Sequence, residues 1–233
     1  MRSPIRSPIR SVIRQTLRLV QRLIPTFSGT EYGDLTGNPI VFTGDFGVEV
    51  EFAITAGLTH TFVSDGSGNV GNISLLPPNN IFVRLGANIV SYAATINLLD
   101  GKIHTAQVSA DSVGDTISIL IDGTESSGDL SLTYAAATFD FIAIKADTMN
   151  NQIRGQLLSV KFTDQSGASD DVTSFVFDSG STTEQFARGE VAPSGVKVDL
   201  INFSDADWDL FTYSQNPRKW TGSSGSPVLE IAE

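Results

Sequence analysis

Residues 46–54 have the sequence FGVEVEFAI, in which apolar side chains recur at every second position. The positions between them carry Gly47, Glu49, Glu51 and Ala53. Because successive side chains of a β-strand point to opposite faces of the sheet, one face of this segment suits a core and the other a wetter environment. The stretch therefore predicts a strand that covers a hydrophobic interior on one side.

Short alternating runs of the same kind fill most of the chain from Phe27 onward, and Gly and Asp-Gly turns separate them. They predict strands at 40–42, 46–54, 60–64, 73–75, 80–85, 89–93, 103–109, 116–121, 139–146 and 156–163, another within 171–180, and a loop followed by a strand in 181–203. Many short strands at such spacing are typical of a sandwich or barrel. A chain of 233 residues accommodates one such domain together with appendages.

The composition limits both the means of stabilisation and the partners. The chain has no cysteine, so neither disulfides nor thiolate metal sites support the fold. The net charge of −11 is unevenly distributed, because residues 1–24 hold six arginines and no acid. The other nine Lys and Arg face all 26 Asp and Glu, which leaves residues 25–233 with a net charge of −17. So acidic a body repels phosphate backbones, which argues against nucleic acid as a partner of the sandwich, although the basic segment alone could bind it nonspecifically.

The first 24 residues carry arginine at every fourth position, at Arg2, Arg6, Arg10, Arg14, Arg18 and Arg22. Ser7 followed by Pro8 suits a helix start and Pro25 suits a stop, which predicts a basic amphipathic helix from about residue 8 to 24. Its apolar stripe comprises Ile9, Val12, Ile13, Leu17, Val20, Leu23 and Ile24. We therefore expect an anchor segment at 1–26 and a sandwich at 27–233, with a strand and loop extension from about residue 165.

Three interpretations of this basic segment stay open. An Arg-rich, Ser-rich and acid-poor amphipathic stretch resembles a mitochondrial targeting peptide. Basic flanks beside an apolar stripe also suit a helix on a membrane surface. In the third interpretation the stripe inserts into a groove of a partner, or bundles with copies of itself as in a trimer, while the arginines meet an acidic surface. We favour this anchor, on the expectation that the chain is ordered from Met1 and so held in a tight site.

Residues 100–104 and 121–123, DGKIH and IDG, flank a pair of predicted strands. Together with FTGDFGVEVEFAI, NNIFVRLGANIVSYAAT and FDFIAIKADTMNNQIRGQLLSVKFTD, they resemble the laminin-G, pentraxin and concanavalin-like superfamily, in which a strand after DGxWH is followed by a turn and a strand ending in VDG. Ile103 stands where that family usually has Trp. The resemblance covers about residues 40–165 and implies an all-β fold with two antiparallel sheets in a jelly-roll sandwich, here preceded by the basic helix.

The titratable residues of the predicted sandwich do not form a recognisable active site. Hydrolases on the resembled fold use alternating Glu and Asp arrays on one strand, whereas Val50 separates Glu49 from Glu51 and Ala53 follows where a third acid is needed. We interpret the two glutamates as solvated residues on an outer strand face. His60 and His104 are too few for a His-based zinc site, and we expect His104 to satisfy a backbone group near a turn. The sequence therefore predicts no enzyme activity.

Two sets of residues are candidates for ligand binding. Laminin-G and lectin domains often hold calcium through loop acids and amides, which here would be Asp65, Asn69, Asp147 and Asn150. The aromatic and acidic C-terminal stretch contains Trp208, Tyr213 and Trp220, whose ring faces suit sugars and protein interfaces but could equally close the edge of the sandwich. No cofactor other than this calcium is expected.

The combination of a basic anchor and an acidic sandwich suggests two classes of function. The leading hypothesis is a structural protein of a virion, a bacteriophage head decoration, fibre or tail component assembled in the host cytoplasm. Residues 1–24 would then bind other virion proteins, and the protein would be a homo-oligomer. The alternative is a carbohydrate-binding, lectin-like module of a cell that recognises a surface glycan; the same recognition could also serve a virion protein in attachment to its host.

Overall fold

The computed structural model describes residues 22–67, 70–144, 151–167, 171–177, 183–186 and 196–211. For residues 22, 23, 186 and 208–211 it describes only the backbone. Leu23–Asp209 form a compact unit, to which the following description applies. No helix within the described ranges is long and apolar enough to cross a membrane.

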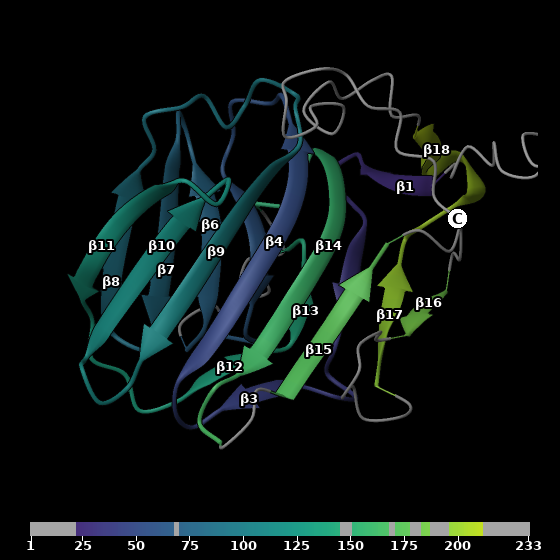
Figure 1. Ribbon diagram of the computed structural model, residues 1–233. Coiled ribbons are helices and arrows are strands. Elements are labelled where there is room, and N and C mark those ends of the chain that lie inside the picture. The colour runs from purple at the N-terminus through teal and green to yellow at the C-terminus, as the bar shows by residue number, and fades with distance from the viewer. Residues whose placement is uncertain are drawn as a thin grey trace, which may run out of the picture. The chain divides into compact units, whose positions relative to one another are not determined.

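The first sheet is antiparallel and runs in the order β11-β10-β9-β4-β14, and Figure 1 shows these strands in front. Its strands are β11 (Glu125–Ser131), β10 (Thr116–Ile121), β9 (His104–Asp111), β4 (Phe46–Ile54) and β14 (Gly155–Asp164). The free edge of β14 pairs with two further strands, β1 (Arg22–Phe27) at its beginning and β15 (Asp171–Val176) along its second half. One long strand therefore holds both an N-terminal and a late segment of the chain in the same sheet.

The second sheet is also antiparallel and runs in the order β16-β17-β2-β13-β5-β6-β7-β8. Its strands are β16 (Glu184–Phe186), β17 (Lys197–Ile201), β2 (Tyr32–Asp34), β13 (Phe141–Ile142), β5 (His60–Ser64), β6 (Asn72–Leu76), β7 (Asn80–Leu85) and β8 (Asn88–Ala93). In Figure 1, β6, β7 and β8 lie behind β9, β10 and β11. A separate pair is formed by β3 (Ile40–Phe42) and β12 (Ala137–Phe139), and η1 (Asp205–Asp207) precedes β18 (Trp208–Phe211). The fold is thus an all-β sandwich.

The inward side chains of the two sheets form one hydrophobic core. Phe52 of β4 contacts Phe62 of β5 with ring centroids 4.7 Å apart, which joins the sheets directly. Near β3, Phe42 stacks on Phe46 with centroids 4.8 Å apart. Aromatic pairs of this kind contribute about 0.5–1.5 kcal/mol each beyond the burial of their area. Packing and strand hydrogen bonds therefore carry the stability of a chain that has no disulfide.

The alternating pattern predicted the strands of both sheets well. The bounds predicted for β3, β4, β5, β7 and β10 are those of the structure, and β6, β8, β9 and β14 differ by one or two residues. β15 and β17 form within the stretches where a late strand was expected. The prediction of an all-β sandwich of two antiparallel sheets is confirmed.

The single strand predicted over 139–146 is wrong, because the chain changes sheets at Asp140. β12 ends at Phe139 and pairs with β3, whereas β13 lies between β2 and β5. Ala143 then has a φ of 69°, a left-handed conformation that ends the strand. β2, β11, β16 and β18 were not predicted as strands. The polar sequence of β11, ESSGDLS, lacks an apolar alternation and becomes a strand because β10 pairs with it.

The helix predicted to continue to Ile24 is wrong at its C-terminal end. Residues 22–27 form β1, whose Thr26 and Phe27 pair with the start of β14. Ile24 is 1% exposed and lies on β1 instead of on a helix, and its role as an anchor residue stays a prediction. Branched Ile24 and Thr26 suit a strand, and tertiary pairing overrides the helical spacing. The predicted helix up to Gln21, with Arg2, Arg6, Arg10, Arg14 and Arg18, lies outside the described residues, and only the backbone of Arg22 and Leu23 is described.

Candidate functional site

A groove of about 200 Å³ lies on the outer face of the second sheet, and we call it the β6–β7 groove. Thr59, Asn72, Ser74, Leu76, Phe82, Arg84 and Asn151 line it. The set combines two amides, two hydroxyls, an arginine and an aromatic ring, and it contains no carboxylate. This chemistry suits an uncharged polar or an anionic ligand.

Alternation along two neighbouring strands brings the groove residues together. Ile73 and Leu75 of β6 point into the core, so Asn72 and Ser74 share the outer face. In β7 the core takes Ile81, Val83 and Leu85, which leaves Phe82 and Arg84 outside. The register of the two strands places Asn72 opposite Arg84 and Ser74 opposite Phe82. Two adjacent cross-strand pairs therefore supply four side chains to one patch.

The floor of the β6–β7 groove is a hydrogen-bonded chain of buried polar side chains. The Ser74 hydroxyl donates to Oδ1 of Asn72 at 2.5 Å, and its Oγ lies 3.1 Å from Oγ1 of Thr61 on β5. Asn72 is 2% exposed and Ser74 is 3% exposed, although both lie on the outer face of the sheet. Hydrogen bonds inside a buried network fix the rotamers of its members. The floor is thus arranged before any ligand arrives.

Phe82 and Arg84 form the more accessible part of the β6–β7 groove, and both are half-buried. Nε of Arg84 donates to the Gly86 carbonyl at 3.1 Å, which holds the guanidinium near the end of β7. Ser91 of β8 lies opposite Phe82 on the other side of the ring from Ser74. The ring is therefore flanked by two small hydroxyl residues, which leave space over it.

Two other grooves in the described part of the chain are acidic. One, of about 250 Å³, lies over β9, β10 and β11 and includes Asp45, Asp111 and Asp129. The other, of about 350 Å³, has Asp164 and Asp171 beside the apolar residues of β3. Carboxylates gathered in this way favour cations and repel anions. The β6–β7 groove differs from both in the sign of its charge.

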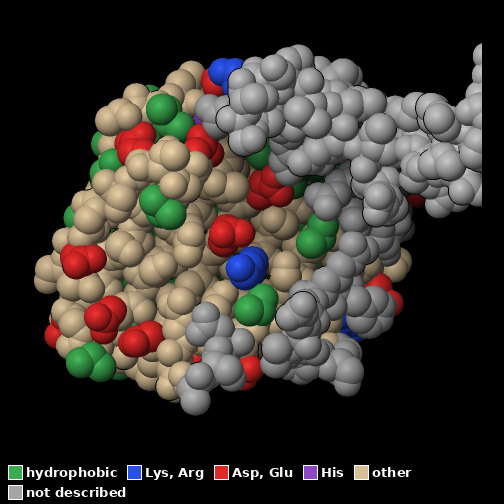
Figure 2. All heavy atoms as spheres, in the orientation of Figure 1, with side chains coloured by type: hydrophobic (Ala, Val, Ile, Leu, Met, Phe, Trp, Pro, Cys, Tyr) green, Lys and Arg blue, Asp and Glu red, His purple; other side chains and the backbone are tan. Residues whose placement is uncertain are grey.

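The outer face of the first sheet, seen in Figure 2, is largely uncharged and polar, with scattered charged side chains. Glu49 and Glu51 of β4 lie on this face and are partly exposed, so their interpretation as solvated outer residues is confirmed. Lys161 of β14 lies directly opposite Glu49. This cross-strand placement of opposite charges offers a structural explanation for Glu49.

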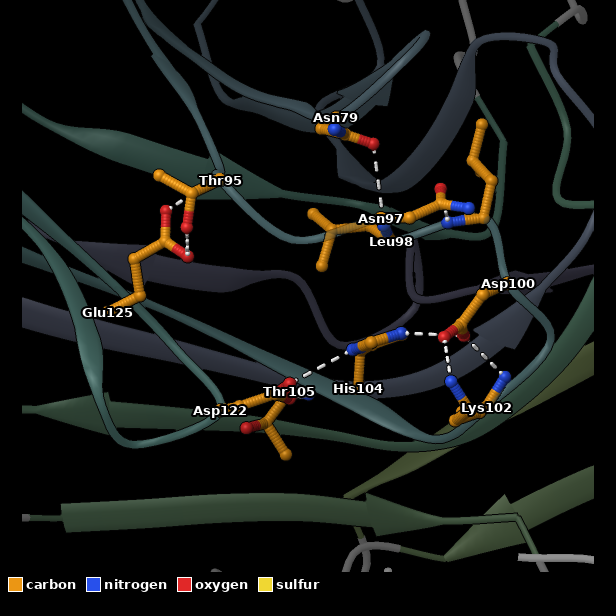
Figure 3. A network of polar contacts seen from close by, with 11 residues as sticks. Asn79, Thr95, Asn97, Leu98, Asp100, Lys102, His104, Thr105, Asp122 and Glu125 are labelled. Carbon is orange, nitrogen blue, oxygen red and sulfur yellow. Dashed lines mark hydrogen bonds and ion pairs between the residues drawn. The ribbon is translucent and has the colours of Figure 1, made fainter.

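The two parts of the DGKIH and IDG pattern meet at His104 (Figure 3). Its Nδ1 lies 3.0 Å from Asp122 and its Nε2 lies 3.0 Å from Asp100, whose carboxylate also binds Lys102. The ring is fully buried, and both of its nitrogens face side-chain carboxylates. The expectation that His104 satisfies a backbone group is therefore wrong for these two nitrogens. Burial opposes ionisation of Asp100, but hydrogen bonds from Lys102 and His104 lower its pKa to about 2. This network joins the 94–103 loop to the β10–β11 turn.

The sequence-predicted calcium set is described at only one member. Asp65 is 3% exposed, and its Oδ2 accepts hydrogen bonds from Ser67 Oγ at 2.5 Å and from the Val70 amide at 3.1 Å. Asn69, Asp147 and Asn150 lie outside the described residues. Within the described ranges no three His, Asp or Glu side chains form a group that could hold a metal ion. Calcium binding stays a prediction.

The predicted sugar-binding aromatics are likewise not tested by the structure. Trp208 begins β18, but its side chain is not described, and Tyr213 and Trp220 lie outside the described residues. Sequence reasoning missed Asn72, Ser74, Phe82 and Arg84. The pattern that could have identified this groove is the pair of Phe82 and Arg84 at outward positions of β7, since a large apolar ring on a solvated strand face suggests a binding surface.

Comparison with known proteins places the fold and no more. No family model and no curated protein matches the chain. A putative carbohydrate binding protein from Bacteroides ovatus is similar over 82% of this chain and 60% of its own length, with a TM-score of 0.59 and 13% identity. The heptameric SAP-like pentraxin from Limulus polyphemus is similar over 60% of this chain and 75% of its own length, with a TM-score of 0.50 and 12% identity.

The chain has a lectin-like β-sandwich fold. Mouse laminin alpha1 domains LG4-5 are a further, weaker match, with a TM-score of 0.46 and 17% identity over 66% of this chain and 43% of theirs. The similarity to the pentraxin supports the expected fold alone. The chain spans about 60% of the length of the Bacteroides protein, and at such identities the likeness carries no function by itself.

Proposed function

We propose that this protein is a non-catalytic carbohydrate-binding module that holds its ligand in the β6–β7 groove. One observation carries the proposal: Asn72 and Ser74 form a buried hydrogen-bonded floor on the outer face of a sheet, beside the ring of Phe82. Outer sheet faces ordinarily keep polar side chains in water, so a preorganised polar floor there is suited to a ligand.

The chemistry of the groove matches the two kinds of surface on a sugar ring. Hydroxyl groups of a saccharide can donate to and accept from amides and hydroxyls, which Asn72, Ser74 and Asn151 provide. The C–H face of a sugar ring can lie on an aromatic ring, which Phe82 provides. A Bacteroides protein of similar fold bears the name of a putative carbohydrate binding protein, which supports the choice of ligand class.

Binding without hydrolysis follows from the absence of acids in the groove. Glycoside hydrolysis ordinarily requires two carboxyl groups about 5–10 Å apart across the scissile bond. Among the described residues that line the β6–β7 groove, none is an Asp or Glu. Glu49 and Glu51 lie in the other sheet, so they cannot act on a ligand in this groove.

The test is a titration of the full chain with a panel of neutral and acidic saccharides, followed by amide chemical shifts. Shifts should concentrate on β6 and β7, and Phe82→Ala should weaken binding roughly tenfold, about 1.4 kcal/mol. Val113→Ala, in the β9–β10 turn, is the matched control because Val113 is exposed and lines none of the described grooves. Shifts confined to other surfaces, or equal binding by the Phe82 variant, would contradict this site.

A role as a virion structural component is a separate proposal that concerns the basic N-terminal segment. It is supported by the contrast between six arginines in residues 1–24 and a body of net charge −17. Removal of residues 1–21 leaves β1 complete. It should abolish incorporation into particles and any oligomer while sugar binding persists. Normal incorporation of the truncated protein would contradict it.

A further inference from the structure

We infer that the ligand of the β6–β7 groove is an acidic saccharide, whose oxyanion, a carboxylate or sulfate, is bound by the guanidinium of Arg84. The inference rests on the proposed function, because it specifies the ligand class of the same groove. It depends on the pairing state of Arg84, on the charge of the groove and on the positions of its neighbours.

Arg84 forms no ion pair with any of the described residues. Within the same part of the chain its Nε donates to the Gly86 carbonyl, and Nη1 and Nη2 are the donors that could bind a ligand. Lys102 and Lys197, in contrast, pair with Asp100 and with Glu184, respectively. Two terminal N–H groups side by side are suited to bind both oxygens of an oxyanion.

The surroundings of Arg84 favour an anion over a neutral group. The described residues of the β6–β7 groove include no Asp or Glu, whereas the acidic grooves over β9–β11 and beside β3 include three and two aspartates. Arg84 is half-buried, so its charge acts through a medium of lower effective dielectric constant than water. An acidic ligand repelled by most of this protein therefore meets an attractive field in the β6–β7 groove.

The neighbours of Arg84 can hold the rest of an acidic sugar. Asn72 lies opposite Arg84 in the β6–β7 ladder, and Phe82 lies two residues away on the same face. With the oxyanion on Arg84, the sugar ring can cover Phe82 while its hydroxyls reach the amide and hydroxyl groups of the floor. The three contacts lie on two rigid strands, which preserves their spacing.

The experiment compares saccharides that differ only at C6, using the full chain. D-glucuronate, D-glucose 6-sulfate and D-glucose form one set, and D-galacturonate and D-galactose form another; affinities come from amide shifts. The acids should bind at least tenfold more tightly than the neutral sugars, and added NaCl should weaken the acids selectively. Arg84→Gln should lower the affinity for the acidic sugars to that for the neutral sugars. Arg84→Lys, which keeps the charge, should retain part of the preference for the acidic sugars.

The outcomes separate this inference from the proposed function. Equal binding of neutral and acidic sugars that depends on Phe82 but not on Arg84 would overturn the inference and leave the proposed function intact. No shift on β6 or β7 with any sugar of the panel would overturn both. Preference for the sulfate over the carboxylate would support the inference and identify the oxyanion. Unfolding midpoints of the Arg84 variants equal to that of the wild type show that lost binding is not lost folding.

Discussion

Nδ1 of His104 lies 3.0 Å from the carboxylate of Asp122, which joins the start of β9 to the turn between β10 and β11. Asp122 and Gly123 both have positive φ, and this turn aims the carboxylate back at β9, where its other oxygen accepts from the Thr105 amide at 2.9 Å. The Nε2 atom of His104 also lies 3.0 Å from a carboxylate oxygen, Oδ1 of Asp100. The ring therefore contacts a carboxylate on each of its two sides.

Replacement of His104 should therefore destabilise the sandwich strongly. In His104→Ala two carboxylates lose a buried partner and a cavity opens beside Phe52, so we expect a loss of roughly 2–4 kcal/mol. His104→Gln, which can donate to only one carboxylate at a time, should lose less. Urea denaturation followed by tryptophan fluorescence measures both variants. An alanine variant as stable as the wild type would show that the network contributes nothing.

The lowered pKa of Asp100 predicts a loss of stability in strong acid. Its folded pKa of about 2 lies below the ordinary 3.8, so the unfolded chain takes up the proton first and stability falls as the pH drops from about 4 to 2. Because solvent screens this carboxylate, we expect its share to be on the order of 1 kcal/mol. Asp100→Asn should be less stable than the wild type at pH 7 and should show a shallower decline below pH 4. Parallel declines would contradict this assignment.

His60 predicts a second, milder pH dependence. Burial lowers the pKa of His60 below its ordinary 6.5, and the neutral ring donates from Nε2 to the Ala56 carbonyl at 2.8 Å while Nδ1 accepts from the Arg154 amide at 3.2 Å. Below pH 6.5 the unfolded chain binds a proton that the folded chain resists, so stability should fall between pH 7.5 and 5.5. His60→Gln can keep both hydrogen bonds without titrating. Its unfolding free energy should therefore vary less over this interval, as measured by denaturant titration at each pH.

A substitution at Ile24 tests whether this residue stabilises the sandwich or serves to anchor a partner. Because its side chain is buried on β1, Ile24→Ala should destabilise the sandwich by roughly 2–4 kcal/mol. Substitution of a residue on an exposed anchor helix would leave the unfolding free energy nearly unchanged. Val113→Ala provides the control, since Val113 is 92% exposed. Thermal unfolding of the two variants beside the wild type decides between the two roles.

The class of fold and most strand positions could be predicted from the amino-acid pattern alone. In β4, β7 and β10 every second residue is apolar. Where a sheet buries one face, this period of two assigns the apolar residues to the core face. The same reasoning placed Glu49 and Glu51 on the outer face, because Val50 and Phe52, the alternate residues of the strand, occupy the core face. The pattern around DGKIH and IDG likewise pointed to a lectin-like sandwich.

Which outward residues lie next to one another depends on how the strands pair in the folded protein. Asn72 and Arg84 are twelve positions apart, and nothing in their local sequence says that the register of β6 and β7 sets them opposite one another. Ile24 fits a helical stripe and a strand equally well, and its strand exists because β14 offers an edge. His104 likewise finds Asp122 through the β9–β10 pairing. The periodicity of a strand can be seen in residues that are close in sequence, whereas the register between strands depends on the free energy of the whole packed sandwich.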